Sequence, residues 1–168
     1  MPKLFKLRAG EIVAADDPYT SIEDDQDMPR GDVIVSLARF RREGEWLLDG
    51  LRRVGVRLAP DEFPESLANE LGRLCCIALV FPKFRDGRAY SAARILRDRL
   101  GFERELRAVG EVLIDQGRYM VRCGFDAFAP ADTSTPEQWT AALHGFRHVY
   151  QRASDDREPA FIERERVA

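Results

Sequence analysis

Cysteine is scarce in this chain of 168 residues, which contains only three: Cys75, Cys76 and Cys123. No Cys-x-x-Cys pair occurs, and three thiols cannot complete a four-cysteine zinc or iron–sulfur site. Cys75 and Cys76 are neighbours in an apolar run, so on a strand they would point to opposite faces and could not form an undistorted disulfide. We therefore expect buried structural thiols and no metal site.

Motifs that bind common cofactors are also missing. The chain has no Gly-x-Gly-x-x-Gly, no Gly-x-x-x-x-Gly-Lys-Ser/Thr and no Gly-x-Ser-x-Gly. His144 and His148 are one helical turn apart, but no glutamate follows the first histidine as in a zincin, which favours a surface or packing role. The sequence thus predicts no cofactor and no metal, and it identifies no catalytic residue.

The chain lacks both a surplus of basic charge and a long apolar run. Its formal net charge of -3 argues against binding to nucleic acid. No run approaches the ~20 apolar residues of a membrane span, and the N-terminus has no signal-peptide h-region. A composition of 45% hydrophobic and 33% charged residues is typical of a globular protein. We expect a cytoplasmic protein without a membrane segment, and its oligomeric state stays open.

Apolar runs and amphipathic stretches alternate along the chain, which predicts an α/β fold. The expected strands span residues 33–39, 56–58, 75–81, 106–109 and 125–129. The expected helices span residues 45–54, 61–74, 87–100, 111–123 and 135–150. About five mainly parallel strands could form either an open doubly wound sheet or a half-barrel of β/α units. The sequence does not decide between these architectures.

Both ends of the chain differ from this alternating pattern. Residues 3–7 and 11–13 alternate around Arg8-Ala9-Gly10, which predicts a small antiparallel hairpin, and an acidic loop follows to residue 32. About half of residues 152–168 are charged, as in a frayed or partner-bound tail. We expect one domain over residues 1–151, with the hairpin and loop of residues 1–31 appended to it.

The most informative stretch is the apolar strand around residues 75–81 and the loop that follows it. Pro82 stops the strand, Asp86-Gly87 forms a turn, and a helix then begins with unpaired amide groups. Several basic residues surround this helix start, so a bound anion is one interpretation and a solvated basic rim is the other. The candidate ligand-binding residues are Lys83, Asp86, Arg88, Tyr90, Ser91, Arg94, Arg107, Asp115 and Gln116.

Asp115 and Gln116 are polar residues among the apolar positions of the helix expected over residues 111–123. A buried polar group without a partner costs ~1–3 kcal/mol, so each needs one. We favour an ion pair of Asp115 with Arg118 or Arg122, with Gln116 bonding to the backbone, over a ligand site.

Several motifs together resemble an uncharacterised bacterial family, a domain of unknown function whose members are commonly described as predicted oxidoreductases of sulfite reduction. The similarity covers about residues 30–150. It rests on the motifs Phe-Pro-Lys-Phe (81–84), Asp-Gly-Arg (86–88), Tyr-Ser (90–91), Glu-Leu-Arg-Ala-Val-Gly (105–110), Asp-Gln (115–116) and Arg-Cys-Gly-Phe-Asp-Ala-Phe (122–128). The chain departs from the family pattern at Gly117-Arg118-Tyr119, where more apolar residues are usual.

The resemblance implies a role in assimilatory sulfate and sulfite reduction, alongside sulfite reductase and phosphoadenylylsulfate reductase. The first hypothesis is an accessory protein or oxidoreductase that binds an oxyanion or a nucleotide at the loop after residue 82. The alternative is a non-catalytic module that docks on sulfite reductase or a related enzyme through the acidic loop and the charged tail. Whether the protein is an enzyme is left open by the sequence.

Overall fold

The computed structural model describes residues 3–155 and 157–167. Its strands are β1 (Leu4–Arg8), β2 (Glu11–Ala15), β3 (Tyr19–Ser21), β4 (Asp32–Ser36), β5 (Val54–Leu58), β6 (Cys76–Phe81), β7 (Glu105–Gly110) and β8 (Ala127–Phe128). Its helices are α1 (Leu37–Leu48), α2 (Arg88–Arg94), α3 (Ile114–Arg122), α4 (Pro136–His144) and α5 (Ala160–Val167), with a 3-10 turn η1 (Pro64–Leu67) and a π-helical turn η2 (Ile95–Arg99).

The described strands form one eight-stranded sheet in the order β2-β1-β8-β7-β6-β5-β4-β3. Neighbouring strands from β3 to β8 run parallel, whereas β1 runs antiparallel to both β2 and β8. The expected sheet of about five mainly parallel strands is therefore corrected to a mixed sheet of eight strands. The predicted N-terminal hairpin is confirmed as β1 and β2, and it extends the sheet by pairing with β8.

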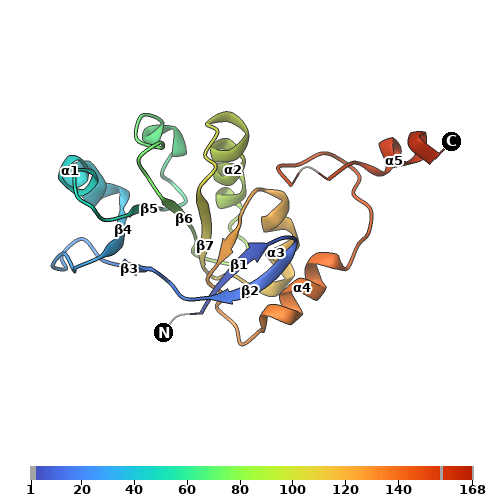
Figure 1. Cartoon of the computed structure of the whole chain (residues 1–168), viewed down its shortest axis with the longest axis horizontal. Helices are drawn as coiled ribbons and strands as arrows, with labels where there is room; N and C mark the ends of the chain where they lie inside the picture. Colours follow the sequence, from blue (N-terminus) through green and yellow to red (C-terminus); the bar gives the residue numbers. More distant parts are fainter. Residues whose placement is uncertain (1–2, 156, 168) are drawn as a thin grey trace.

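The sheet is a half-barrel, and the alternative of a doubly wound sheet is wrong. Strands β3 to β8 follow one another in sequence order, and right-handed crossovers between such strands place their helices on one face. Only residues 16–18 join β2 to β3, the two outermost strands. That link can span at most roughly 14 Å, whereas seven strand spacings add up to about 34 Å. The sheet must therefore curl until its edges approach each other, as Figure 1 shows.

Apolar side chains pack on both faces of this curled sheet. The larger cluster lies between the sheet and the helices and includes Leu47, Ile77, Leu96 and Trp139. A smaller cluster lies on the inner face and consists of Tyr19, Ile34, Cys76 and Ala78, with Cys75 packed against it. Cys76 and Cys123 are buried as predicted, while Cys75 is only partly buried.

The first helix begins earlier than the apolar spacing of residues 45–54 predicts. α1 begins directly after β4 because the Ser36 hydroxyl accepts a hydrogen bond from Arg39 N at 3.0 Å and caps the helix. Trp46 and Leu51, which were part of the predicted apolar face, are 59% and fully exposed. Val54 belongs to β5 instead, so the apparent periodicity joined residues of a helix, a turn and a strand.

Three further predicted segments differ from the structure. The helix expected over residues 61–74 is reduced to η1, although Leu67, Leu71 and Leu74 are buried together as the pattern predicted. The acidic loop contains the short edge strand β3, because its Tyr19 pairs with Asp32 of β4. The charged tail includes helix α5, which the composition did not reveal.

α4 begins as the sequence predicted but ends earlier, at His144 instead of residue 150. The hydroxyl of Thr135 accepts a hydrogen bond from Gln138 N at 3.4 Å, and Pro136 stands in the first turn. Gly117 of α3 sets how closely α4 packs, because an added Cβ would lie 2.7 Å from the Trp139 ring. This close approach leaves the opposite face of α3 turned away from α4.

Candidate functional site

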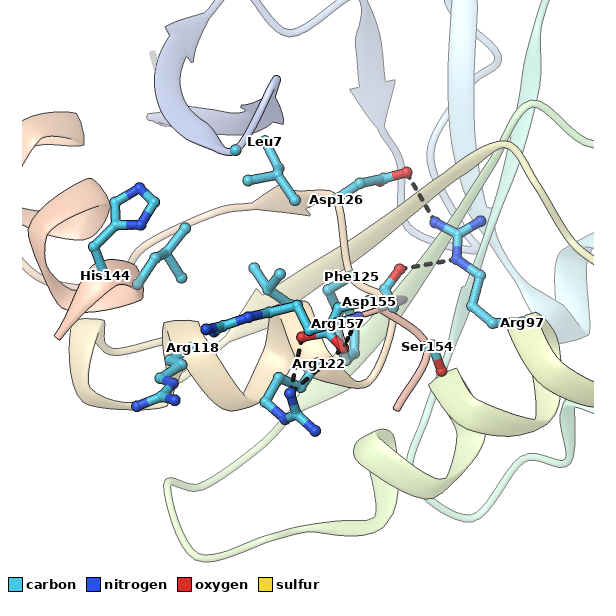
Figure 2. Close-up of a pocket in the computed structure, with 14 residues that line it drawn as sticks. Leu7, Arg97, Arg118, Arg122, Phe125, Asp126, His144, Ser154, Asp155 and Arg157 are labelled. Carbon is cyan, nitrogen blue, oxygen red and sulfur yellow. Dashed lines mark hydrogen bonds and ion pairs between the residues drawn. The ribbon is translucent and has the colours of Figure 1, made fainter. Parts of the chain in front are cut away.

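The outward face of α3 forms one wall of a cleft. Asp115, Arg118, Tyr119 and Arg122 follow at helical spacing on this face, and the chain over residues 145–155 lies against them. The cleft consists of three adjoining cavities of about 120, 470 and 610 Å³. Arg122 lines all three, and Figure 2 shows the largest.

The smallest cavity, which we call the Tyr90 pocket, brings together three of the predicted ligand-binding residues, Tyr90, Ser91 and Arg94. Its wall contains hydroxyl groups, a thiol and two guanidinium groups. It is lined by Tyr90, Ser91, Arg94, Tyr119, Arg122, Cys123, Gln151 and Ala153. The pocket lies between α2, the end of α3 and the chain after α4.

Aromatic packing and hydrogen bonds hold the α2 side of the pocket. The Tyr90 ring lies edge-on to Phe81, with centroids 5.1 Å apart, and to Tyr119, with centroids 4.7 Å apart. Arg94 pairs with Asp98 in the following turn, and the Ser154 hydroxyl donates to the same carboxylate at 2.7 Å. Asp98 of η2 therefore joins α2 to the chain after α4 at the rim of the pocket.

Arg122 joins α3 to the same C-terminal chain. Its Nη1 lies 3.0 Å from Oδ2 of Asp155, and its Nη2 donates to the Gln151 carbonyl oxygen at 2.6 Å. The backbone N–H of Ser154 donates to the Arg122 carbonyl oxygen at 3.0 Å. Arg122 thus lines the cleft and also holds the chain over residues 151–155 against α3.

The Tyr90 phenol and the Cys123 thiol both keep their protons near neutral pH, because the pKa of each group is raised. Burial raises the pKa of Tyr90 to about 12, so its phenol keeps its proton. Burial also raises the pKa of the Cys123 thiol, despite the nearby charge of Arg94. A protonated thiol is a poor nucleophile, so the pocket is suited to binding through N–H and O–H donors and not to thiolate chemistry.

The predicted basic loop after β6 does not line the Tyr90 pocket. Lys83 is exposed. Arg88 donates to the Asp86 carboxylate through Nε at 3.0 Å and Nη2 at 2.6 Å. These bonds with Arg88 lower the pKa of Asp86. A carboxylate of the chain itself therefore stands at the helix start where we predicted a bound anion.

Asp115 and Gln116 have different surroundings. Asp115 is exposed and lines the middle cavity, and among the described residues it forms no ion pair with Arg118 or Arg122. Arg122 pairs with Asp155 instead, which corrects the expected ion pair. Gln116 is buried; its Nε2 donates to the Phe84 carbonyl oxygen at 3.1 Å and its Oε1 accepts from Leu113 N at 3.2 Å. Gln116 thus bonds to the backbone, as predicted.

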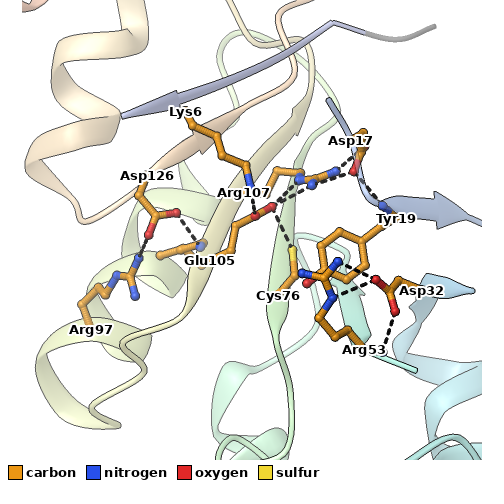
Figure 3. A network of polar contacts seen from close by, with 11 residues as sticks. Lys6, Asp17, Tyr19, Asp32, Arg53, Cys76, Arg97, Glu105, Arg107 and Asp126 are labelled. Atoms are coloured by element: carbon orange, nitrogen blue, oxygen red, sulfur yellow. Dashed lines mark hydrogen bonds and ion pairs between the residues drawn. The ribbon is translucent and has the colours of Figure 1, made fainter. Parts of the chain in front are cut away.

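Arg107 lies apart from the cleft, in a polar network on the inner face of the half-barrel (Figure 3). Its guanidinium is bidentate to Asp17, at 2.7 and 3.0 Å, and lies 2.7 Å from Glu105. Lys6 also pairs with Glu105 at 2.7 Å, and the Cys76 thiol lies 3.5 Å from that carboxylate. Arg107 is only 3% exposed, so this network is a buried anchor of the fold.

Some of these residues could have been found from spacing alone. Tyr119 and Arg122 are one turn apart on the same helix as Asp115, and Glu105 and Arg107 are two apart on a strand, which puts each pair on one face. The contributions of Asp17 and of residues 151–155 had no such local signal. These contributions depend on the β2–β3 link, which places Asp17 over the sheet, and on the chain after α4, which packs against α3.

None of the helices within residues 3–155 and 157–167 combines the length and the apolar character of a membrane-spanning helix. Comparison with curated proteins finds no match to the chain. Residues 55–161 match the family DUF934, described as a bacterial protein of unknown function. The matched residues include α2, α3 and the chain after α4, which together line the Tyr90 pocket. Because the match covers more than half of the 168 residues, the chain belongs to the DUF934 family.

Proposed function

We propose that this protein is an accessory protein of assimilatory sulfate or sulfite reduction that binds a small oxyanion in the Tyr90 pocket. The sulfur chemistry of this proposal rests on the resemblance of its motifs to the predicted oxidoreductases of sulfite reduction. The observation that carries the binding step is the meeting of Arg94 and Arg122 with the hydroxyl groups of Tyr90, Ser91 and Tyr119 around one cavity.

The size of the Tyr90 pocket favours an oxyanion over a nucleotide. Pockets for organic ligands usually measure ~300–1,000 Å³. The Tyr90 pocket measures about 120 Å³. Since one water molecule takes up ~30 Å³ of the liquid, a group such as sulfite or sulfate has a suitable size.

The donors of the pocket also suit an oxyanion. Arginine carries five N–H donors, and the contacts of Arg94 to Asp98 and of Arg122 to Asp155 and Gln151 use only part of each set. The remaining donors, with the neutral hydroxyl of Tyr90, can bind an anion through charge-assisted hydrogen bonds. The carboxylates behind each guanidinium hold it in position.

We expect one sulfite or sulfate ion to bind per chain. Arg94→Gln is expected to weaken that binding at least about tenfold. A hydrogen bond to a charged group contributes ~1.5–3 kcal/mol, and ~1.4 kcal/mol corresponds to tenfold in Kd. The measurement is isothermal titration calorimetry under anaerobic conditions, which keeps sulfite from oxidising. A thermal shift with each anion gives a second readout.

Two controls locate the site. Arg99→Gln removes an exposed arginine of η2 that does not line the pocket, and it should leave the affinity unchanged. The double variant Lys83→Ala/Arg88→Ala tests the basic loop predicted from the sequence. Loss of binding in the double variant alone would move the site to that loop, and absence of binding in the parent protein would refute the proposal.

A second candidate function is that of a non-catalytic module that docks on sulfite reductase. It is favoured by aromatic side chains that stand exposed around the cleft: Tyr119 at 57%, Phe146 at 68% and Tyr150 at 90%. Aromatic residues and arginine are enriched in protein interfaces and in their energetic hot spots.

Tyr150→Ser is expected to weaken capture of sulfite reductase at least about tenfold if the protein docks through this surface, since a hot-spot residue contributes ~2 kcal/mol or more. Biolayer interferometry with the purified reductase measures the affinity. Trp46→Ser removes another exposed aromatic residue, 59% exposed, from α1, away from the cleft, and serves as the control. Equal loss in both variants would contradict docking at the cleft.

A further inference from the structure

The largest cavity of the cleft, which we call the Arg118 cavity, has a volume of about 610 Å³ and shares only Arg122 with the Tyr90 pocket. Its walls come from the β1–β2 hairpin, from α3, from the end of α4 and from Ser154, Asp155 and Arg157 of the chain after α4 (Figure 2). This volume lies within the ~300–1,000 Å³ that is usual for pockets of organic ligands. The cavity is therefore large enough for a different class of ligand than an oxyanion.

One part of the Arg118 cavity is apolar. It is lined by Leu7 of the hairpin, Val121 of α3, Phe125 of the turn after α3, and Leu143 of α4. Phe125 is 1% exposed and Leu143 is 7% exposed, so these walls are parts of the packed interior and not loose surface groups. Such a surface favours an aromatic ring or a short hydrocarbon chain.

Another part carries three guanidinium groups, of Arg118, Arg122 and Arg157. Arg122 is neutralised by Asp155. Arg118 stacks on the Phe146 ring at 4.4 Å, and Arg157 donates to the backbone carbonyl oxygens of residues 146 and 147. Among the residues that the structure describes, neither Arg118 nor Arg157 forms an ion pair with a carboxylate in this cavity.

The crowding of like charge also affects the pKa of Arg118. Partial burial and the charges of Arg157 and Arg122 lower its pKa, and only Asp155 acts in the opposite direction. An anion bound between these guanidinium groups would relieve that repulsion. On the far wall, Arg97 is already engaged by Asp126 at 2.8 Å and by the Gly124 carbonyl oxygen, so it forms part of the scaffold.

We propose that the Arg118 cavity binds an organic anion with an apolar body. The aromatic or aliphatic part of the ligand packs against Val121, Phe125 and Leu143, and its carboxylate, sulfonate or phosphate group lies between Arg118 and Arg157. The inference rests on an apolar wall and guanidinium groups that lie next to each other in one cavity of this size. It does not depend on the proposed oxyanion site, since the two cavities share only one side chain.

The probe for this site is 8-anilino-1-naphthalenesulfonate, which joins aromatic rings to a sulfonate. We expect saturable binding with one probe per chain, followed by fluorescence and calorimetry. The double variant Arg118→Gln/Arg157→Gln should weaken the sulfonate about tenfold or more. It should change the affinity for the uncharged N-phenyl-1-naphthylamine by less than about twofold, because that molecule has no group for the guanidinium pair.

Filling the cavity tests the apolar half. Val121→Trp, and Leu7→Trp as a second choice should the first fail to fold, are expected to abolish binding of both probes. Arg99→Gln removes a distant charge and should bind the sulfonate as the parent does. Circular dichroism verifies that each variant is folded.

Three results would overturn the proposal: no saturable binding, equal loss of both probes on removing the two arginines, or unchanged binding in a folded cavity-filling variant. Titration of sulfite into the Arg118→Gln/Arg157→Gln variant separates this proposal from the oxyanion site. Retained sulfite binding with lost sulfonate binding is the expected pattern. Retained sulfonate binding in that variant would refute the Arg118 cavity whether or not sulfite binds.

Discussion

Arg107→Ala is expected to destabilise the native protein by about 3–5 kcal/mol, as does removal of one partner from other buried ion pairs. The guanidinium of Arg107 is 3% exposed and bonds to Asp17 and Glu105. Its loss leaves two carboxylates near each other on the inner face with only Lys6 to balance them. Equilibrium unfolding in urea at pH 7 measures the change.

The matched control is Arg57→Ala. Arg57 also points to the inner face, in register with Ala78, which is in turn in register with Arg107. It is more exposed, and its partner Glu23 is 60% exposed, so its loss should cost at most about 1 kcal/mol. If the two variants lost similar amounts of unfolding free energy, burial of the Arg107 network would not be what makes its ion pairs stabilising.

The pH dependence gives a second check on the Arg107 network. Burial opposes ionisation of Glu105, but the charges of Arg107 and Lys6 and their hydrogen bonds outweigh it and lower the pKa of Glu105. A lowered pKa contributes stability above the unfolded value of ~4.3 that is lost as the pH falls through the folded value. The stability difference between parent and Arg107→Ala should therefore shrink as the pH falls below about 4, through the lowered pKa of Glu105. A constant difference would contradict this account of Glu105.

Gly110→Ala is expected to cost more than about 3 kcal/mol, because backbone strain of ~1–3 kcal/mol adds to steric overlap of similar size. Gly110 has a φ of +95°, and a Cβ built there would lie 2.3 Å from the Phe81 carbonyl oxygen. That oxygen accepts the Glu111 N–H at 2.7 Å, so the backbone has no room to move away. The free energy of unfolding in guanidinium chloride measures the effect.

Gly72→Ala is the control for this prediction, since an added Cβ at Gly72 would meet nothing within 4 Å. We expect a change of less than about 1 kcal/mol, in the stabilising direction if the backbone already suits alanine. A Gly110→Ala variant as stable as Gly72→Ala would show that the turn between β7 and α3 can relax. The turn matters for the cleft, because it directs α3 and with it Tyr119 and Arg122.

The amino-acid sequence by itself determined the features that depend on neighbouring residues. The α/β class, the N-terminal hairpin, the start of α4 at Thr135-Pro136 and the burial of Cys76 and Cys123 follow from local patterns, turn residues and capping groups. Tyr90, Ser91 and Arg94 were predicted only as candidate ligand-binding residues, and their places on one helix, α2, bring them to one pocket. Such signals involve residues that are only a few positions apart in the chain. The predictions that were confirmed are those that depend on such local signals.

Only the tertiary structure decided the curl of the sheet and the grouping of the site. Asp17 and Arg107 are 90 residues apart in the chain, and they meet because the sheet closes on itself. Arg122 bonds to Asp155 and not to Asp115 because the chain after α4 returns over α3. The strand order and the path of a loop depend on the total free energy of packing, to which no short stretch contributes enough to be read alone. For that physical reason only the tertiary structure shows that the candidate residues lie in three different places: the loop after β6, the Arg107 network and the cleft.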